Sequence, residues 1–215
     1  MAPLTSIRTS EGKLEIVNQL ILPHTVEFIE IKTIDDAYEA IKSMKAGIFT
    51  LQRIHALTSS LHPQIRGAPA IASLAALSVA DYLTRALESV PEPAWFASAG
   101  AFSEHVEAIL AHLFTARPTA VNLGAATRRL SKALSASADA GKDVRAIAAE
   151  LVAEAREIDA EDVGRNKQMS KWGGDWLVER VRAAGVGGGD ELNVMTVCNT
   201  GSLATSVSSL VECKS

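Results

Sequence analysis

The sequence predicts an α+β domain, built from a small antiparallel sheet plus a helical bundle, followed by only the first strand of a doubly wound α/β domain. Three observations predict this fold class. Apolar residues make up 47% of the 215 residues but aromatic residues only 5%, a balance typical of packed helices. Strand-like alternation is confined to an early stretch, and helical periodicity follows it. A glycine-rich segment then precedes one last apolar strand.

The charge and cysteine content exclude several classes of partner. The net charge is −4 and the pI is near 5.8, which argues against nucleic acid or an anionic membrane as the partner. The two cysteines, Cys198 and Cys213, cannot form a disulfide framework and indicate reduced thiols in an intracellular protein. Without a signal-like N-terminus or an apolar run of 18 residues, a soluble location is expected.

The first 64 residues predict the sheet and one helix. Residues 1–12 are polar and predict a leading loop, while 14–31 predict two or three short strands with a turn near Pro23. Thr33 is the expected N-cap of a helix whose first turn carries acidic side chains. Residues 46–64 keep no sustained period and indicate a surface loop or an irregular helical insert.

The middle of the chain predicts a helical bundle around one core. Its helices should be separated by proline-containing breakers at Pro91, Pro93 and Arg117-Pro118 and by a turn at 139–142. The first two expected helices run from the Gly67-Ala68-Pro69 segment to about 87 and over 103–116. The next follows the breaker segment 117–123 and continues through 134. The last two cover 143–163 and 166–184, with an interruption at Gly173-Gly174.

A domain boundary is expected in the glycine-rich hinge at 185–189. It lacks the GxGxxG order that a dinucleotide loop requires. The apolar strand 192–197 follows, and then the turn Cys198-Asn199-Thr200-Gly201. This order is how a doubly wound α/β domain begins, so the predicted domains are 1–185, including the atypical insert 46–64, and 190–215.

The neighbouring residues suggest a function for two positions, Arg66 and Cys198. Arg66 stands just ahead of a helix start, where it could form a phosphate-binding corner or simply be an exposed arginine. Cys198 occupies a strand-end turn rich in hydroxyls and backbone N–H groups, where it could be a reactive thiol or a small buried side chain. The five histidines show no metal-ligand spacing, so no metal site is expected. Trp172 and Trp176 are interpreted as packing residues rather than a ligand platform.

Three segments taken together resemble the methylthioribose-1-phosphate isomerase family, within the superfamily of initiation factor 2B regulatory subunits. These segments are Ile65-Arg66-Gly67-Ala68-Pro69-Ala70-Ile71, Arg117-Pro118-Thr119-Ala120-Val121-Asn122-Leu123 and Cys198-Asn199-Thr200-Gly201-Ser202-Leu203-Ala204-Thr205. The resemblance covers most of 14–205 apart from the insert. It implies an N-terminal domain of sheet and helices joined to a Rossmann-like domain, a homodimer, and no metal or nucleotide cofactor. It also implies a location in the cytoplasm and, in addition, in the nucleus.

The resemblance implies an aldose–ketose isomerase of the methionine salvage pathway, which converts 5-methylthioribose 1-phosphate to 5-methylthioribulose 1-phosphate. By correspondence, Arg66, Gly67, Ala68 and Arg117 would bind the phosphorylated sugar. Cys198 would be the catalytic group that assists proton movement or stabilises the transition state.

The sequence departs from the family pattern in two places. The insert 46–64 directly precedes Arg66, and 206–215 leave the pattern where the family continues. The family's catalytic aspartate, which belongs to a later segment, has no counterpart. A truncated or aberrantly spliced isomerase without turnover of its own is therefore expected. The alternative is a non-catalytic interaction or regulatory module related to the initiation factor subunits.

Overall fold

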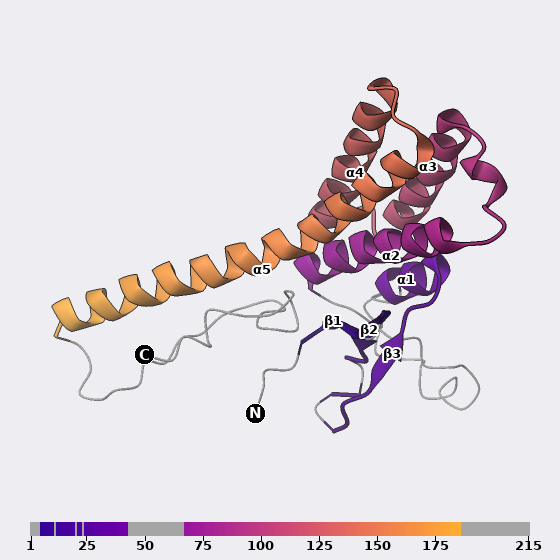
Figure 1. Ribbon diagram of the computed structural model, residues 1–215. Coiled ribbons are helices and arrows are strands. Elements are labelled where there is room, and N and C mark those ends of the chain that lie inside the picture. The colour runs from indigo at the N-terminus through magenta and orange to yellow at the C-terminus, as the bar shows by residue number, and fades with distance from the viewer. Residues whose placement is uncertain (1–4, 11, 20, 23, 43–66, 186–215) are drawn as a thin grey trace.

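The computed structural model describes residues 5–10, 12–19, 21–22, 24–42 and 67–185, which form one three-stranded sheet and five α-helices. The sheet and all five helices contribute to one hydrophobic core, and the distal half of the last helix extends beyond it (Figure 1). The α+β class of the first domain is confirmed. The insert 46–64, the expected strand 192–197 and the whole predicted domain 190–215 lie outside the described residues.

The sheet comprises β1 (Ile7–Ser10), β2 (Lys13–Val17) and β3 (Phe28–Glu30), in that order and antiparallel throughout. In the central strand β2, Ile16 pairs with Ile7 of β1 on one side and with Ile29 of β3 on the other. The prediction of a loop over 1–12 is wrong for β1. Of its four residues only Ile7 is buried, so this edge strand offers no apolar alternation to recognise. Gly12, at φ +76°, lies in the tight connection to β2 and adopts a conformation that favours glycine.

Helix α1 (Ile34–Lys42) begins where the sequence predicts, at a reciprocal cap. The Asp36 N–H donates to Thr33 Oγ1 over 3.0 Å, and the Thr33 N–H donates to the Asp36 carboxylate over 2.9 Å. The two bonds give hydrogen-bond acceptors to two backbone N–H groups that have no partner within the helix. The buried face of α1, which includes Ala37 and Ile41, then packs on α2 and α3.

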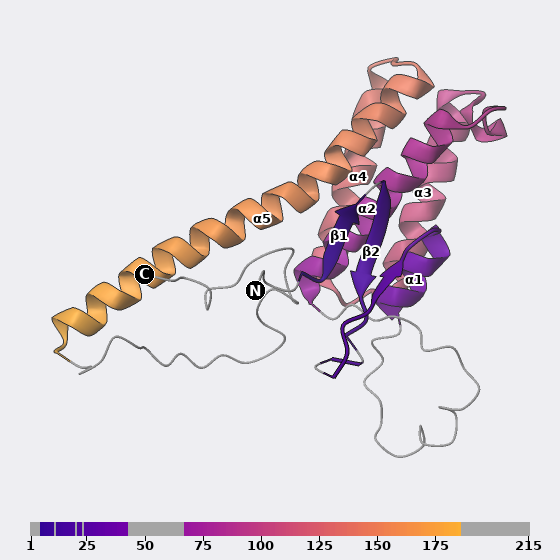
Figure 2. The same ribbon diagram turned by 60° about the horizontal axis from the view of Figure 1, so that its bottom comes forward.

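Helix α2 (Ala68–Glu88) is the central helix of the fold. It contacts α1, α4, α5 and β2, and Figures 1 and 2 show it between the sheet and the other helices. Most of its buried residues are alanines and serines, whose small side chains allow neighbouring helices to approach closely. By length and composition alone α2 could cross a membrane, yet 67% of its apolar window is buried inside the protein, as expected of a core helix.

Helices α3 (Ala99–Ala116) and α4 (Val121–Asp139) follow the proline breakers and the short 3-10 turn η2 (Ala94–Phe96). The sequence predicts both helices, but their bounds differ. α3 starts four residues earlier than expected because the Ser98 hydroxyl accepts the Ala101 N–H over 3.1 Å and so caps it there. α4 continues to Asp139, and Gly141 at φ +69° forms the turn after it.

Helix α5 (Val144–Ala183) corrects the sequence prediction most clearly, because it is one uninterrupted helix of 40 residues. The sequence predicts two helices, over 143–163 and 166–184, the second interrupted at Gly173-Gly174. Glycine keeps its N–H and therefore weakens a helix by only about 1 kcal/mol relative to alanine, without removing a helical hydrogen bond. The distal half projects beyond the bundle (Figure 1), leaving Trp172 and Trp176 65% and 58% exposed. The interpretation of this pair as packing residues is therefore wrong for the described part of the chain.

Candidate functional site

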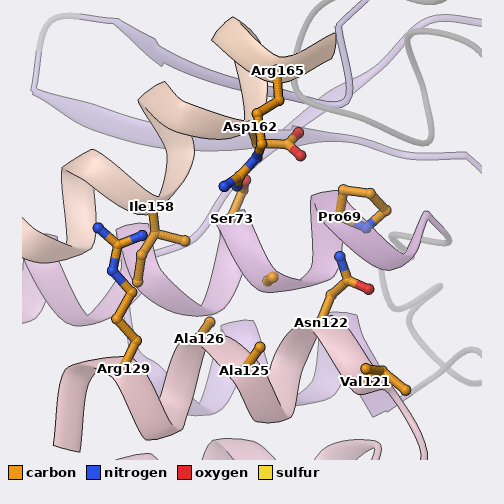
Figure 3. A pocket seen from close by; sticks show the side chains of 11 residues that line it. Pro69, Ser73, Val121, Asn122, Ala125, Ala126, Arg129, Ile158, Asp162 and Arg165 are labelled. Carbon is orange, nitrogen blue, oxygen red and sulfur yellow. The ribbon is translucent and has the colours of Figure 1, made fainter. Parts of the chain in front are cut away.

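The first turns of α2 and α4 border one cavity, which α5 closes on the third side (Figure 3). Its volume is about 290 Å³, close to the lower end of the range of about 300–1,000 Å³ that small-ligand sites occupy. Each of the three helices contributes several side chains to its wall. These are Pro69, Ala72 and Ser73 from α2, Val121, Asn122, Ala125, Ala126 and Arg129 from α4, and Ile158, Asp162 and Arg165 from α5.

Two helices begin at this cavity, and their N-terminal residues share the same backbone conformation. Gly67 and Ala120 are the N-caps of α2 and α4, and both have extended backbone conformations. Pro69 fits the first turn of α2 because its fixed φ suits a helix and its missing N–H is not needed there. Within the described residues, no side chain caps either helix. The first-turn N–H groups and the positive ends of both helix dipoles therefore favour an anion at this edge of the bundle.

Three of the predicted binding residues lie in the segments that lead into this edge. Gly67 is the buried N-cap of α2 and Ala68 is its exposed first residue. Arg117 is half-buried and ends α3, and its carbonyl accepts the Ala120 N–H over 2.9 Å in the tight connection to α4. The structure thus brings the two helix starts that follow these residues to one cavity. Their role in binding a sugar phosphate stays a prediction.

The other two predicted site residues, Arg66 and Cys198, lie outside the described residues.

An ion-pair cluster on one wall of the cavity was missed by the sequence interpretation. Arg129 donates two hydrogen bonds of 2.8 Å to the two oxygens of Glu161, and a third bond from its Nε to Glu154. These two carboxylates, Glu161 first, raise the pKa of the Arg129 guanidinium, while the hydrogen bond from Arg129 holds the pKa of Glu161 below its usual 4.5. The cluster ties α4 to α5, and two carboxylates already balance the charge of Arg129.

No local signal could have revealed this cluster. The acidic run that includes Glu161 and Asp162 suggests a solvated helix end, but both residues lie well inside α5. The bond partners Arg129 and Glu161 are 32 residues apart in sequence, so their pairing depends on how α4 and α5 pack.

The two histidines of α3 contact aromatic and polar side chains of other elements. His105 shares a 2.8 Å hydrogen bond with the Tyr82 hydroxyl and stacks on Trp95, with ring centroids 4.2 Å apart. His112 lies 3.0 Å from an Asp35 carboxylate oxygen and stacks on Tyr38. Among the described residues, no group of three or more potential metal-binding side chains comes together.

Comparison with known families places the sequence in a defined group. A model of the "Initiation factor 2 subunit family" matches residues 64–214. The chain is 61% identical to a methylthioribose-1-phosphate isomerase of Postia placenta over 206 residues, which cover 96% of this chain and 48% of that protein. It is 57% identical to the Laccaria bicolor methylthioribose-1-phosphate isomerase over 203 residues, covering 94% and 48%. The resemblance to these isomerases is therefore confirmed, and the chain spans about half the length of the curated relatives it matches.

Solved structures agree with the sequence comparison. The 5-methylthioribose 1-phosphate isomerase of Pyrococcus horikoshii matches with a TM-score of 0.70 at 26% identity, covering 97% of this chain and 47% of that one. The delta subunit of translation initiation factor eIF-2B from A. fulgidus matches with a TM-score of 0.61 at 28% identity, covering 95% and 47%. The same arrangement of elements thus occurs in an isomerase and in an initiation factor subunit.

Proposed function

Because the chain belongs to the initiation factor 2 subunit family, we propose that it acts in the isomerisation of 5-methylthioribose 1-phosphate to 5-methylthioribulose 1-phosphate. The observation that carries this proposal is the 61% identity, across 96% of the chain, to a protein named as that isomerase. The cavity supports it, because two helix starts that favour an anion meet beside a space of small-ligand size.

The substrate's chemistry defines what the protein must do. The phosphate ester on C1 prevents the sugar from opening to a free aldehyde. Isomerisation therefore breaks the bond between C1 and the ring oxygen, which takes a proton from an acid. Hydrogen then moves from C2 to C1, and the C2 hydroxyl gives up its proton as the carbonyl forms. One proton is taken and one is returned, so the reaction needs no net oxidant or reductant.

In this proposal the arginines hold the phosphate and Cys198 acts at the reacting carbons. A guanidinium presents a planar pair of donors that a phosphate accepts in a bidentate manner, which suits Arg117 and Arg66. Gly67 and Ala68 bring the backbone of the α2 start to the same group. Cys198 would assist proton transfer or stabilise the developing charge.

The test is isomerase activity of the chain alone and of a fusion. In the fusion, residue 205 continues into the corresponding second half of the Postia placenta relative. We expect the fusion to form 5-methylthioribulose 1-phosphate, and Cys198→Ser to lower its kcat by about 10²–10⁴-fold. Arg117→Lys should mainly raise KM, because lysine cannot reproduce the bidentate contact. A folded fusion without turnover would contradict the proposal. The same assay on residues 1–215 tests the expectation that they do not turn over substrate by themselves.

A second candidate is a non-catalytic module that binds another subunit. It is favoured by the match to the initiation factor subunit of A. fulgidus, at a slightly higher identity than the matched isomerase structure. Stoichiometric co-purification of residues 1–215 with the full-length Postia placenta isomerase would support it. A monodisperse monomer that ignores this subunit in size-exclusion chromatography would count against it.

A further inference from the structure

One polar side chain of the α2–α4–α5 cavity has no hydrogen-bond partner among the described residues, and it belongs to Asn122. Asn122 is the second residue of α4, is exposed, and points from α4 toward the start of α2 at Pro69 (Figure 3). It lies five residues after Arg117. Asn122 therefore belongs to the wall of the cavity and is close in sequence to the predicted phosphate ligand Arg117.

The other polar side chains of the wall are engaged elsewhere. Arg129 bonds to Glu154 and Glu161. Arg165 donates to Glu161 over 3.0 Å, Asp162 accepts from Asn166 over 3.0 Å, and Ser73 also has an interaction. Each of these side chains already has a protein partner, whereas the amide of Asn122 has none among the described residues and can bind a ligand without competition from a protein group.

The rest of the wall is made of short apolar side chains. Pro69, Ala72, Val121, Ala125, Ala126 and Ile158 line it, and Val121 is 79% exposed at its edge. Such a surface accepts an uncharged group and gives no compensation for burying a second phosphate. The cavity therefore suits the uncharged part of a ligand whose anionic part stays near the helix starts.

The chemistry of an amide selects the group that it binds. The Asn122 side chain can donate through its NH₂ group and accept through its carbonyl oxygen. An ionised phosphate only accepts, and so could use half of this capacity. A sugar hydroxyl both donates and accepts, and so matches the amide fully.

On this basis, and given the proposed function, we propose that Asn122 binds a hydroxyl of the sugar ring while the apolar wall beside it receives the sugar's uncharged end. The phosphate then lies outside the cavity, toward Arg117 and the helix starts. Asn122 thus becomes a determinant of sugar binding rather than of phosphate binding.

The test compares two probes on residues 1–215 by isothermal titration calorimetry: inorganic phosphate and 5-methylthioribose 1-phosphate. Asn122→Ala should weaken binding of the sugar phosphate about three- to tenfold, the value of one hydrogen bond, and leave the phosphate Kd within about twofold of wild type. Ala125→Leu, at an exposed position of the wall, should also weaken only the sugar phosphate by filling the space. Ser135→Ala, at an exposed position of α4 outside the cavity, is the matched control and should change neither affinity.

The possible outcomes separate the role of Asn122 from the proposed function. If wild type binds the sugar phosphate and Asn122→Ala binds it equally well, the role of Asn122 is wrong while the proposed function stands. If Asn122→Ala loses both probes to the same degree, the amide contacts the phosphate, and the inference is also wrong. If wild type binds 5-methylthioribose 1-phosphate no more tightly than inorganic phosphate, the proposed substrate class is wrong and the inference is wrong with it. Equal thermal midpoints of the variants exclude misfolding as the cause.

Discussion

Replacing Arg129 by methionine should reveal how strongly the cavity wall is held together. The side chain makes a bidentate contact with Glu161 and a further contact with Glu154, and so joins α4 to α5. Methionine retains an apolar stem of similar length, and the change therefore removes the charge and the donors while it keeps most of the packing.

The magnitude follows from the number of contacts and their exposure. Hydrogen bonds to charged groups contribute about 1.5–3 kcal/mol when shielded, but exposed ion pairs contribute only about 0.2–1 kcal/mol. The side chains of Arg129 and Glu161 are 35% and 33% exposed, so solvent screens them in part. We expect a loss of about 1–2 kcal/mol in the free energy of unfolding, which lowers the Tm by roughly 2–8 °C for a chain of this size.

The loss should depend on pH in a defined direction. Arg129 lowers the pKa of Glu161 below its usual 4.5. A carboxyl whose folded pKa is depressed stabilises the fold fully above its unfolded pKa, and this contribution disappears as pH falls through the folded value. The difference between wild type and Arg129→Met should thus be constant from about pH 8 to about pH 6 and shrink below about pH 4.5.

Urea denaturation followed by circular dichroism, repeated across this pH range, measures the effect. Arg165→Met is the matched control, because Arg165 is 62% exposed and makes a single 3.0 Å contact with the same Glu161. It should cost at most about 0.5 kcal/mol. Equal losses for the two variants, or a loss for Arg129→Met that does not change below pH 4.5, would refute the assignment of Arg129 as the principal link.

Three further predictions concern the core, a helix cap and a half-buried histidine. Leu83→Ala should cost about 2–5 kcal/mol in urea denaturation, because Leu83 is fully buried in α2 and its removal leaves a cavity. Asp143→Ala should cost about 1 kcal/mol by losing the 3.0 Å bond from the Ala146 N–H at the start of α5, whereas Asp143→Asn should retain most of it. The pKa of His105, measured by NMR, should lie below its usual value of 6.5, because burial disfavours the charged ring. Since this lowered pKa disfavours the imidazolium, stability should fall as pH drops through the folded pKa, and a midpoint at or above 6.5 would contradict the burial argument.

The sequence by itself was sufficient for the local features of this protein. The cap at Thr33 and the helix that starts at Gly67-Ala68-Pro69 follow from a few adjacent residues. Helical periodicity and proline breakers likewise act within about ten residues. The family resemblance rested on three short segments and was confirmed by comparison over nearly the whole chain.

Features that depend on two distant parts of the chain were decided only by the tertiary structure. β1 is a strand because β2 pairs with it, although only Ile7 carries an apolar signal. α5 continues through Gly173-Gly174, where a pair of glycines is tolerated without a break. The cavity with Asn122 and the Arg129 cluster exist because α2, α4 and α5 pack together, joining residues 25 and 32 positions apart. Periodicity reveals which face of a helix is buried, but only packing decides which residues meet across it.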